Sequence, residues 1–227
     1  MHFFILLILI VLLIFAPQLW VQHVLARYNR RDEGFPGSGG ELARHLLDRF
    51  GLESVRVEVA EGQGDHYDPS AKAVRLSADK IEGRTLTAIT TAAHEVGHAI
   101  QHSQGYQPFK WRMRMVGMVA VFERLGSFML FAVPILAAVT KAPAAGLLML
   151  VAALFTVGLG LVVQLLTLPV EWDASFSRAL PILEAGYIKP EQQQAARRIL
   201  RACALTYVAS SLAGLLNFWR WMQVLRR

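Results

Sequence analysis

Long apolar runs alternate with mixed polar segments along the chain. The first run, residues 3–21, contains no charged side chain, and a helix of that length covers the roughly 30 Å hydrocarbon core of a bilayer. Comparable apolar runs follow at about residues 115–139, 147–168 and 203–222. We therefore expect about four membrane-spanning helices, each close to the roughly 20 residues that a span requires.

The first apolar run has a second interpretation, as a cleaved signal peptide. Signal peptides have a basic start and a small-residue cleavage site. No Lys or Arg precedes this run, and residues 18–22 offer no such site. We expect an uncleaved anchor with Trp20 at the membrane interface.

The mixed segment after the first apolar run changes its period along its length. Leu42, Leu46 and Leu47 share one face of a helix that residues Ser38 to Gly40 could cap. The residues that follow alternate with the period of a strand. The expected elements are, in order, a helix over Glu41–Phe50, strands over Val55–Val59 and Ala73–Leu76, and a helix over Thr85–Gln101.

Composition supports a membrane protein over a soluble one. Of the 227 residues 54% are hydrophobic, and the mean hydropathy is +0.38. The net charge of +6 comes from basic residues beside the apolar runs. This placement favours anionic lipid head groups over nucleic acid, for which no binding module is recognisable. The single cysteine, Cys203, excludes an intrachain disulfide, and we expect it to be a buried, inert thiol.

A metal-binding motif, HEVGH, covers His94–His98 on the last of these expected helices. Positions i and i+4 lie one above the other on a helix, so both histidines can reach one zinc ion. Glu95 can then take a proton from the water that attacks a peptide carbonyl. The alternative is a pair of structural histidines on a buried helix. Gly97 costs on the order of 1 kcal/mol of helix stability relative to Ala, which a close approach of another segment would explain.

A catalytic zinc site needs a third protein ligand and an open position. No third histidine follows at short spacing, so a carboxylate farther along the chain is the expected donor. Glu171, after the third apolar run, is the first candidate, with an ordinary interfacial charge as the alternative. Asp173 is the rival ligand, or a partner for a zinc-bound histidine. With about four spans, Glu171 and the motif would lie on the same side of the membrane.

Several motifs in combination resemble one known family. They are DHYDP at residues 65–69, VRLS at 74–77, AAHEVGHAIQ at 92–101 and LPVEWDAS at 168–175. With these motifs the chain resembles the YugP-type neutral zinc metallopeptidases over nearly its whole length. The resemblance implies a gluzincin-like site in which His94, His98 and Glu171 hold one Zn²⁺ ion and Glu95 is the catalytic base.

Two positions depart from the patterns that this resemblance brings. Trp172 stands where the family usually has Phe, which is a mild change. Gluzincins commonly place an Asp four residues after the ligand Glu, but that position is Ser175 here and the Asp lies at position 173. The hydrogen-bond partners of the zinc-binding histidines are therefore left open.

Other residues have candidate roles near the site. Arg178, seven residues after Glu171, is a catalytic candidate that would stabilise the oxyanion, with a structural or lipid-facing role as the alternative. His102 is expected to lie at the surface or to support a zinc ligand, and His66 is expected to be structural. The strand over residues 73–77 could be an exposed edge that an extended substrate joins, or an ordinary paired strand.

These patterns predict a mainly α membrane protein with about four transmembrane helices and a small α+β zincin-like catalytic domain. The expected parts are an anchor over residues 1–24, the catalytic domain over 25–110, two transmembrane helices over 111–168, a helical segment with the third zinc ligand over 169–202, and a last helix and tail over 203–227.

The expected function is a membrane-embedded zinc endopeptidase that acts on protein or peptide substrates. The lipid bilayer is an expected partner, nucleic acid is not, and a membrane-protein partner is left open. The alternatives are a zinc-binding membrane scaffold, which an intact Glu95 disfavours, and a zinc hydrolase of a non-peptide amide. We expect a multi-pass protein of the cell membrane, in a bacterium the inner membrane. Basic residues near the motif favour a cytoplasmic catalytic face.

Overall fold

The computed structural model of the chain describes residues 2–30, 34–62, 64–118, 147–148, 151, 163 and 166–215. The chain divides into two compact units. One unit, called the sheet unit below, combines Ala16–Lys110 with Leu168–Thr206, and the other comprises Met1–Phe15, Trp111–Thr167 and Tyr207–Arg227. Every residue of the candidate site belongs to the sheet unit. The domain boundaries expected from the sequence stay a prediction.

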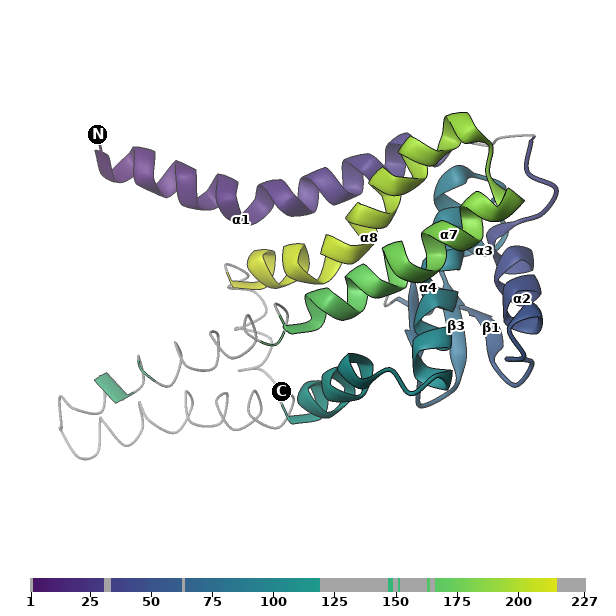
Figure 1. Cartoon of the computed structure of the whole chain (residues 1–227). Coiled ribbons are helices and arrows are strands. Elements are labelled where there is room, and N and C mark those ends of the chain that lie inside the picture. The colour runs from purple at the N-terminus through teal and green to yellow at the C-terminus, as the bar shows by residue number, and fades with distance from the viewer. Residues whose placement is uncertain are drawn as a thin grey trace. The chain divides into compact units, whose positions relative to one another are not determined.

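Helices dominate the described residues, and one small sheet accompanies them (Figure 1). The first half of the chain forms α1 (His2–Arg27), α2 (Gly39–Arg49), β1 (Arg56–Val59), β2 (His66–Asp68), β3 (Ala73–Leu76), α3 (Ala78–Ile81) and α4 (Leu86–Ser103). Residues 107–118 and 166–172 are also helical. The second half continues with the π-helical η1 (Asp173–Ala179), α7 (Leu180–Ile182), the π-helical η2 (Leu183–Tyr187) and α8 (Pro190–Leu215).

Helix α2 begins where the sequence predicts a cap. The Ser38 hydroxyl accepts a hydrogen bond from the Glu41 backbone N–H at 3.3 Å, and the Glu41 carboxylate accepts one from the Ser38 N–H at 2.7 Å. This reciprocal capping box satisfies two backbone donors that the first turn leaves open. The expected apolar face of α2 is confirmed, since Leu42, Leu46 and Leu47 are all buried.

The three-stranded sheet has the order β1-β3-β2, so β3 is its central strand. Strand β3 pairs in parallel with β1 and antiparallel with β2. The hypothesis that residues 73–77 form a free edge is therefore wrong, and the alternative of an ordinary paired strand is confirmed, because β3 pairs with a strand on both sides. Edge positions belong to β1 and β2, which the sequence analysis did not single out as edges.

The two faces of the sheet differ in polarity, as the alternation of side chains along a strand requires. Tyr67 and Val74 are paired across β2 and β3 and are both buried. On the opposite face Arg75 forms ion pairs with Glu58 of β1 and Asp68 of β2, at 3.1 and 2.6 Å. In Figure 1 the strand β3 lies beside α4, which contacts both β2 and β3.

The structure does not support the expected four membrane spans. Among the described residues, no helix combines the length and the apolar character that crossing a membrane requires. In α8 the reason is its polar start, which reads PEQQQAARR. Most of the apolar runs at 115–139 and 147–168, and the end of the run at 203–222, lie outside the described residues. The prediction of a multi-pass membrane fold is therefore wrong for the part of the chain that the structure describes.

Candidate metal centre

Helix α4 carries the HEVGH motif through the core of the sheet unit. The Thr85 hydroxyl caps its start by accepting the Ala88 N–H at 3.0 Å, and every residue from Leu86 to Gln101 is buried. The rings of His94 and His98 lie 4.7 Å apart between centroids. This is the neighbour relation that the i, i+4 spacing predicts for a helix.

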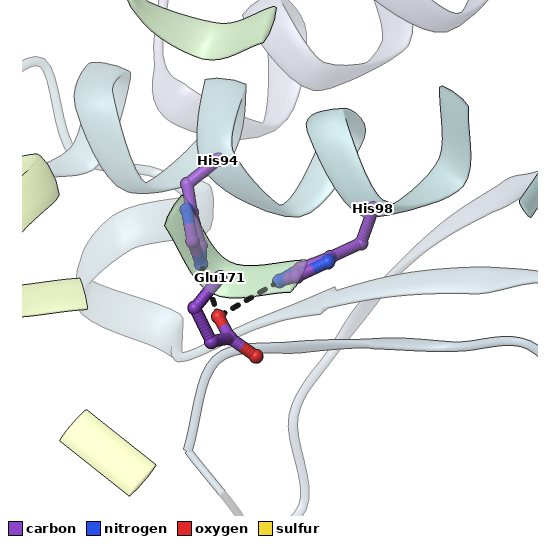
Figure 2. Close-up of side chains that lie close together, drawn as sticks. All are labelled: His94, His98 and Glu171. Carbon is purple, nitrogen blue, oxygen red and sulfur yellow. Dashed lines mark hydrogen bonds and ion pairs between the residues drawn. The ribbon is translucent and has the colours of Figure 1, made fainter. Parts of the chain in front are cut away.

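Glu171 meets both histidines from a second helical segment (Figure 2). Its Oε2 lies 3.3 Å from Nε2 of His94 and 3.1 Å from Nε2 of His98. The three residues are 2%, 4% and 1% exposed for His94, His98 and Glu171. Their potential ligand atoms all lie within 4.8 Å of one another. Two residues close in sequence and one far away thus converge on one buried point.

Gly97 permits the approach that brings Glu171 to α4. A Cβ added at Gly97 would lie 2.8 Å from the backbone oxygen of Ala174, which follows Glu171 by less than one turn. Real Cβ atoms essentially never come that close to a backbone oxygen. The expected explanation for this helix glycine is confirmed: another segment lies against the backbone of α4 at this point.

We predict that Gly97→Ala destabilises the protein, although alanine favours a helix by about 1 kcal/mol over glycine. The added methyl group must displace the Ala174 backbone, and overpacking of this kind costs about 1–3 kcal/mol. The movement would also carry Glu171 away from the histidines. Thermal unfolding of the metal-free protein and zinc affinity measure the two effects.

Gly117→Ala is the matched control, because a Cβ there meets nothing within 4 Å among the described residues and residues 107–118 are also helical. We expect that variant to be as stable as the wild type or slightly more stable. Equal unfolding midpoints for the two glycine variants would contradict the close-packing explanation.

The ring of His94 is oriented by Ser175. Nδ1 of His94 lies 3.0 Å from the Ser175 hydroxyl, which donates in turn to the backbone oxygen of Leu200 at 3.2 Å. Because the hydroxyl proton is directed to Leu200, its oxygen is free to accept from Nδ1–H. Nε2 of His94 then carries the lone pair and faces Glu171. Ser175 stands at the position where gluzincins commonly have Asp. Its uncharged hydroxyl is thus the hydrogen-bond partner of His94 in place of a carboxylate.

The ring of His98 is oriented by Gln101, one turn farther along α4. Nδ1 of His98 lies 2.9 Å from Oε1 of Gln101. The Gln101 amide donates through Nε2 to the backbone oxygen of Val170 and to Oδ2 of Asp173, both at 2.8 Å. Gln101 is fully buried. This one side chain therefore connects the second histidine to the segment that carries Glu171.

The donor set fits a zinc ion. Two imidazole nitrogens and one carboxylate are a ligand combination of catalytic zinc sites, which leave one position open. The Nδ1 atom of each ring already has a hydrogen-bond partner, which is the usual arrangement for metal-binding histidines. Among the described residues, His94, His98 and Glu171 are the group found to be close enough for a shared ion. Both the short distances between the ligand atoms and the types of donor therefore indicate that this cluster can bind a zinc ion.

The segment after Glu171 is π-helical, which changes the side-chain directions that an α-helix would give. The Leu180 N–H bonds to the Ser175 oxygen, five residues back, as a π-helix requires. Arg178 therefore reaches Asp173, five residues before it, with Nε 2.7 Å from Oδ2. Its NH1 group donates to Oε1 of Gln104 at 2.7 Å. The expectation that Arg178 shares a face with Glu171 assumed α-helical spacing, which the π-helical η1 does not have. The oxyanion role expected for Arg178 stays a prediction.

Two further buried residues are Glu95 of the motif and Cys203 of α8. Glu95 is 6% exposed, and its negative charge contributes to the environment of Cys203. Burial, followed by the charge of Glu95, strongly raises the pKa of the Cys203 thiol. Cys203 is buried, as predicted, and a thiol that resists ionisation is unreactive.

The other candidate histidines lie apart from the three ligand atoms. His66, on β2, contacts the backbone oxygen of Gly64 at 2.9 Å. Nδ1 of His102 lies 2.9 Å from the Tyr67 hydroxyl. Burial raises the pKa of Tyr67 to about 12 and lowers that of His102. Phe109 lies against the rings of His98, His102 and Tyr67, so this cluster supports one side of the site.

Sequence reasoning did not assign a role to Gln101 or to Ser175. Gln101 has a signal in hindsight, since it is a polar residue one turn after His98 at the end of a buried helix. Ser175 follows Glu171 by four residues and so shares its face. Neither signal identifies which histidine the side chain contacts, because that depends on how the two helical segments pack.

Comparisons with known proteins agree with this chemistry. A model of the family described as "Putative neutral zinc metallopeptidase" matches residues 3–226. The chain is also similar to the "Putative membrane protease YugP" of Bacillus subtilis (strain 168), with 34% identity over 211 residues that cover 92% of this chain and 90% of the relative. No solved structure matches the chain significantly.

Proposed function

The chain belongs to the neutral zinc metallopeptidase family, and from this premise we propose that it is a zinc-dependent endopeptidase. His94, His98 and Glu171 would hold one zinc ion, and Glu95 would act as the general base. The observation that carries the proposal is the buried convergence of these three ligand atoms within 4.8 Å. Together with the family, it supports a catalytic rather than a structural centre, because the three ligands leave one zinc position open.

The proposed reaction is hydrolysis of a peptide bond. A zinc ion bound here would supply Lewis acidity, polarising a carbonyl and lowering the pKa of a water molecule toward about 7. Glu95 would take the proton from the attacking water and deliver it to the leaving amine. Its place beside His94 on a buried helix supports this role, since it is 6% exposed and so holds its carboxylate away from bulk solvent.

Protein or peptide substrates follow from the family. The relative is named a membrane protease, and we propose that this chain also acts at a membrane surface. Trp20 is 41% exposed near the end of α1, with Arg27 in its last turn, a combination suited to a lipid interface. A cytoplasmic catalytic face was expected from about four spans, which the described residues do not support, and we do not propose it.

Zinc removal tests the proposal directly. We expect the full chain, purified in detergent, to carry one zinc ion per chain and to cleave protein substrates. A chelator should abolish cleavage, and added zinc should restore it. Metal analysis and the cleavage products on a gel measure the two properties. Zinc-loaded protein that cleaves no protein or peptide would exclude the peptidase and favour a scaffold or a hydrolase of non-peptide amides.

A further inference from the structure

A continuous hydrogen-bonded chain links the surface of the sheet unit to His98. It begins at Arg178, whose Nε donates to Oδ2 of Asp173 at 2.7 Å. The same Oδ2 accepts from Nε2 of Gln101 at 2.8 Å, and Oε1 of Gln101 lies 2.9 Å from Nδ1 of His98. Along this series of hydrogen bonds the side chains become less exposed to solvent. Those of Arg178 and Asp173 are partly exposed, and Gln101 is fully buried.

The chemistry of the partners fixes which group donates and which accepts in each of these hydrogen bonds. Asp173 and the backbone oxygen of Val170 can only accept hydrogen bonds, and both face Nε2 of Gln101. The Gln101 amide therefore cannot rotate to exchange its oxygen and nitrogen without placing its oxygen against two other oxygens. Its Oε1 is held toward His98, so Nδ1 of His98 must be the donor. The lone pair of that imidazole is left on Nε2, toward Glu171.

We propose that Arg178, Asp173 and Gln101 form a tautomer latch, a set of positioning residues that keeps Nε2 of His98 ready to bind metal. The proposal rests on the zinc site proposed above. The nitrogen of a histidine that binds metal is set by the hydrogen bond of the other nitrogen. Here the other nitrogen, Nδ1, bonds to Gln101. The Arg178–Asp173 ion pair of η1 keeps Gln101 in place through its hydrogen bond to Asp173. Arg178 acts on the site through Asp173.

The latch also joins the two segments that supply ligands. Gln101 belongs to α4, whereas Asp173 and Arg178 belong to η1. Gln104, just after α4, accepts a second hydrogen bond from Arg178 at 2.7 Å. The Arg178 guanidinium also lies 5.6 Å from the ring centre of Tyr106. These contacts fix the position of Asp173 relative to α4, and so fix the direction of the Gln101 amide.

The test compares Asp173→Asn and Arg178→Ala with two matched controls. Glu184→Gln and Arg197→Ala remove charge from another ion pair of the same length, 2.7 Å, which lies apart from the histidine cluster among the described residues. Zinc affinity of the purified full chain is measured by chelator competition. We expect Asp173→Asn to weaken zinc binding about 10–100-fold, the range for residues that support metal ligands. Arg178→Ala should act in the same direction, and Arg178→Lys should restore part of the loss.

A second measurement separates positioning from general stability. In the zinc-loaded protein, nuclear magnetic resonance of ¹⁵N-labelled histidine detects the Nδ1 proton of His98. We expect slow exchange of this proton in the wild type and in both controls, and faster exchange in Asp173→Asn and Arg178→Ala. Unfolding of the metal-free variants gives the purely structural effect.

The latch is overturned if Asp173→Asn and Arg178→Ala match their controls in zinc affinity and proton exchange, or if the wild type binds no zinc. A wild type that binds zinc but cleaves no peptide would refute the proposed peptidase. The zinc-affinity and exchange contrasts between variants would still stand in that case. The two failures are therefore distinguishable.

Discussion

Replacing Glu95 with glutamine is expected to lower kcat by about 10²–10⁴-fold, the usual contribution of a general base, while zinc stays bound. Glutamine has nearly the same shape as glutamate, but it cannot take a proton from the attacking water. Because Glu95 is not one of the three clustered ligand candidates, metal content should not change. Zinc analysis and the rate of cleavage of a protein substrate, measured on the same preparation, test both parts.

Glu53→Gln is a suitable control for this variant, since Glu53 is exposed and the same change there should leave the rate unaltered. Identical cleavage by wild type and Glu95→Gln, with zinc present in both, would remove Glu95 from the mechanism. Loss of zinc in Glu95→Gln would instead indicate that this carboxylate helps to hold the metal.

Replacing Glu171 with alanine is expected to weaken zinc binding by more than about 100-fold, the upper range for residues that only support metal ligands. The change removes a carboxylate whose Oε2 lies 3.3 Å from Nε2 of His94 and 3.1 Å from Nε2 of His98. Two histidines alone would leave the ion with too few protein donors for a catalytic site. Chelator competition gives the dissociation constant, and activity should fall in parallel.

Glu184→Ala, in the neighbouring segment η2, is the control for removing a carboxylate without touching the cluster. Full zinc occupancy in Glu171→Ala would show that another residue is the third ligand. Asp173 was the rival from the sequence, but its Oδ2 already accepts hydrogen bonds from Gln101 and Arg178. These contacts favour Glu171 as the ligand and Asp173 as its support.

Local pattern predicted several elements well. Strand β3 spans Ala73–Leu76, as expected, and α4 runs from Leu86 to Ser103 where Thr85–Gln101 was predicted. The short strand β2 was missed, because three residues next to a turn give almost no alternation to detect. Its partner β3 was then misjudged as a possible edge. Pairing across a sheet is a non-local property, and a single strand does not reveal how many neighbours it has.

The expected membrane topology was also wrong for the described residues. Glu171 was the first candidate because it follows the third apolar run, and about four spans would have put it on the same side of the membrane as the motif. The structure does not support that span count. Glu171 and the motif nevertheless meet, because η1, which follows Glu171, packs against α4 at Gly97. The structure brings Glu171 close to the two histidines, while its role as the third zinc ligand stays a prediction.

The sequence by itself determined the part of the site that one helix controls. The spacing of His94 and His98 requires that their side chains neighbour each other on a helix, and the glycine between them indicated a close approach. Only the tertiary structure decided which carboxylate meets the two rings and which residues orient them. Glu171 is 73 residues from His98, and a π-helical turn redirects the side chains after it. Helix geometry fixes relations within a few residues, whereas packing between segments fixes those that span the chain.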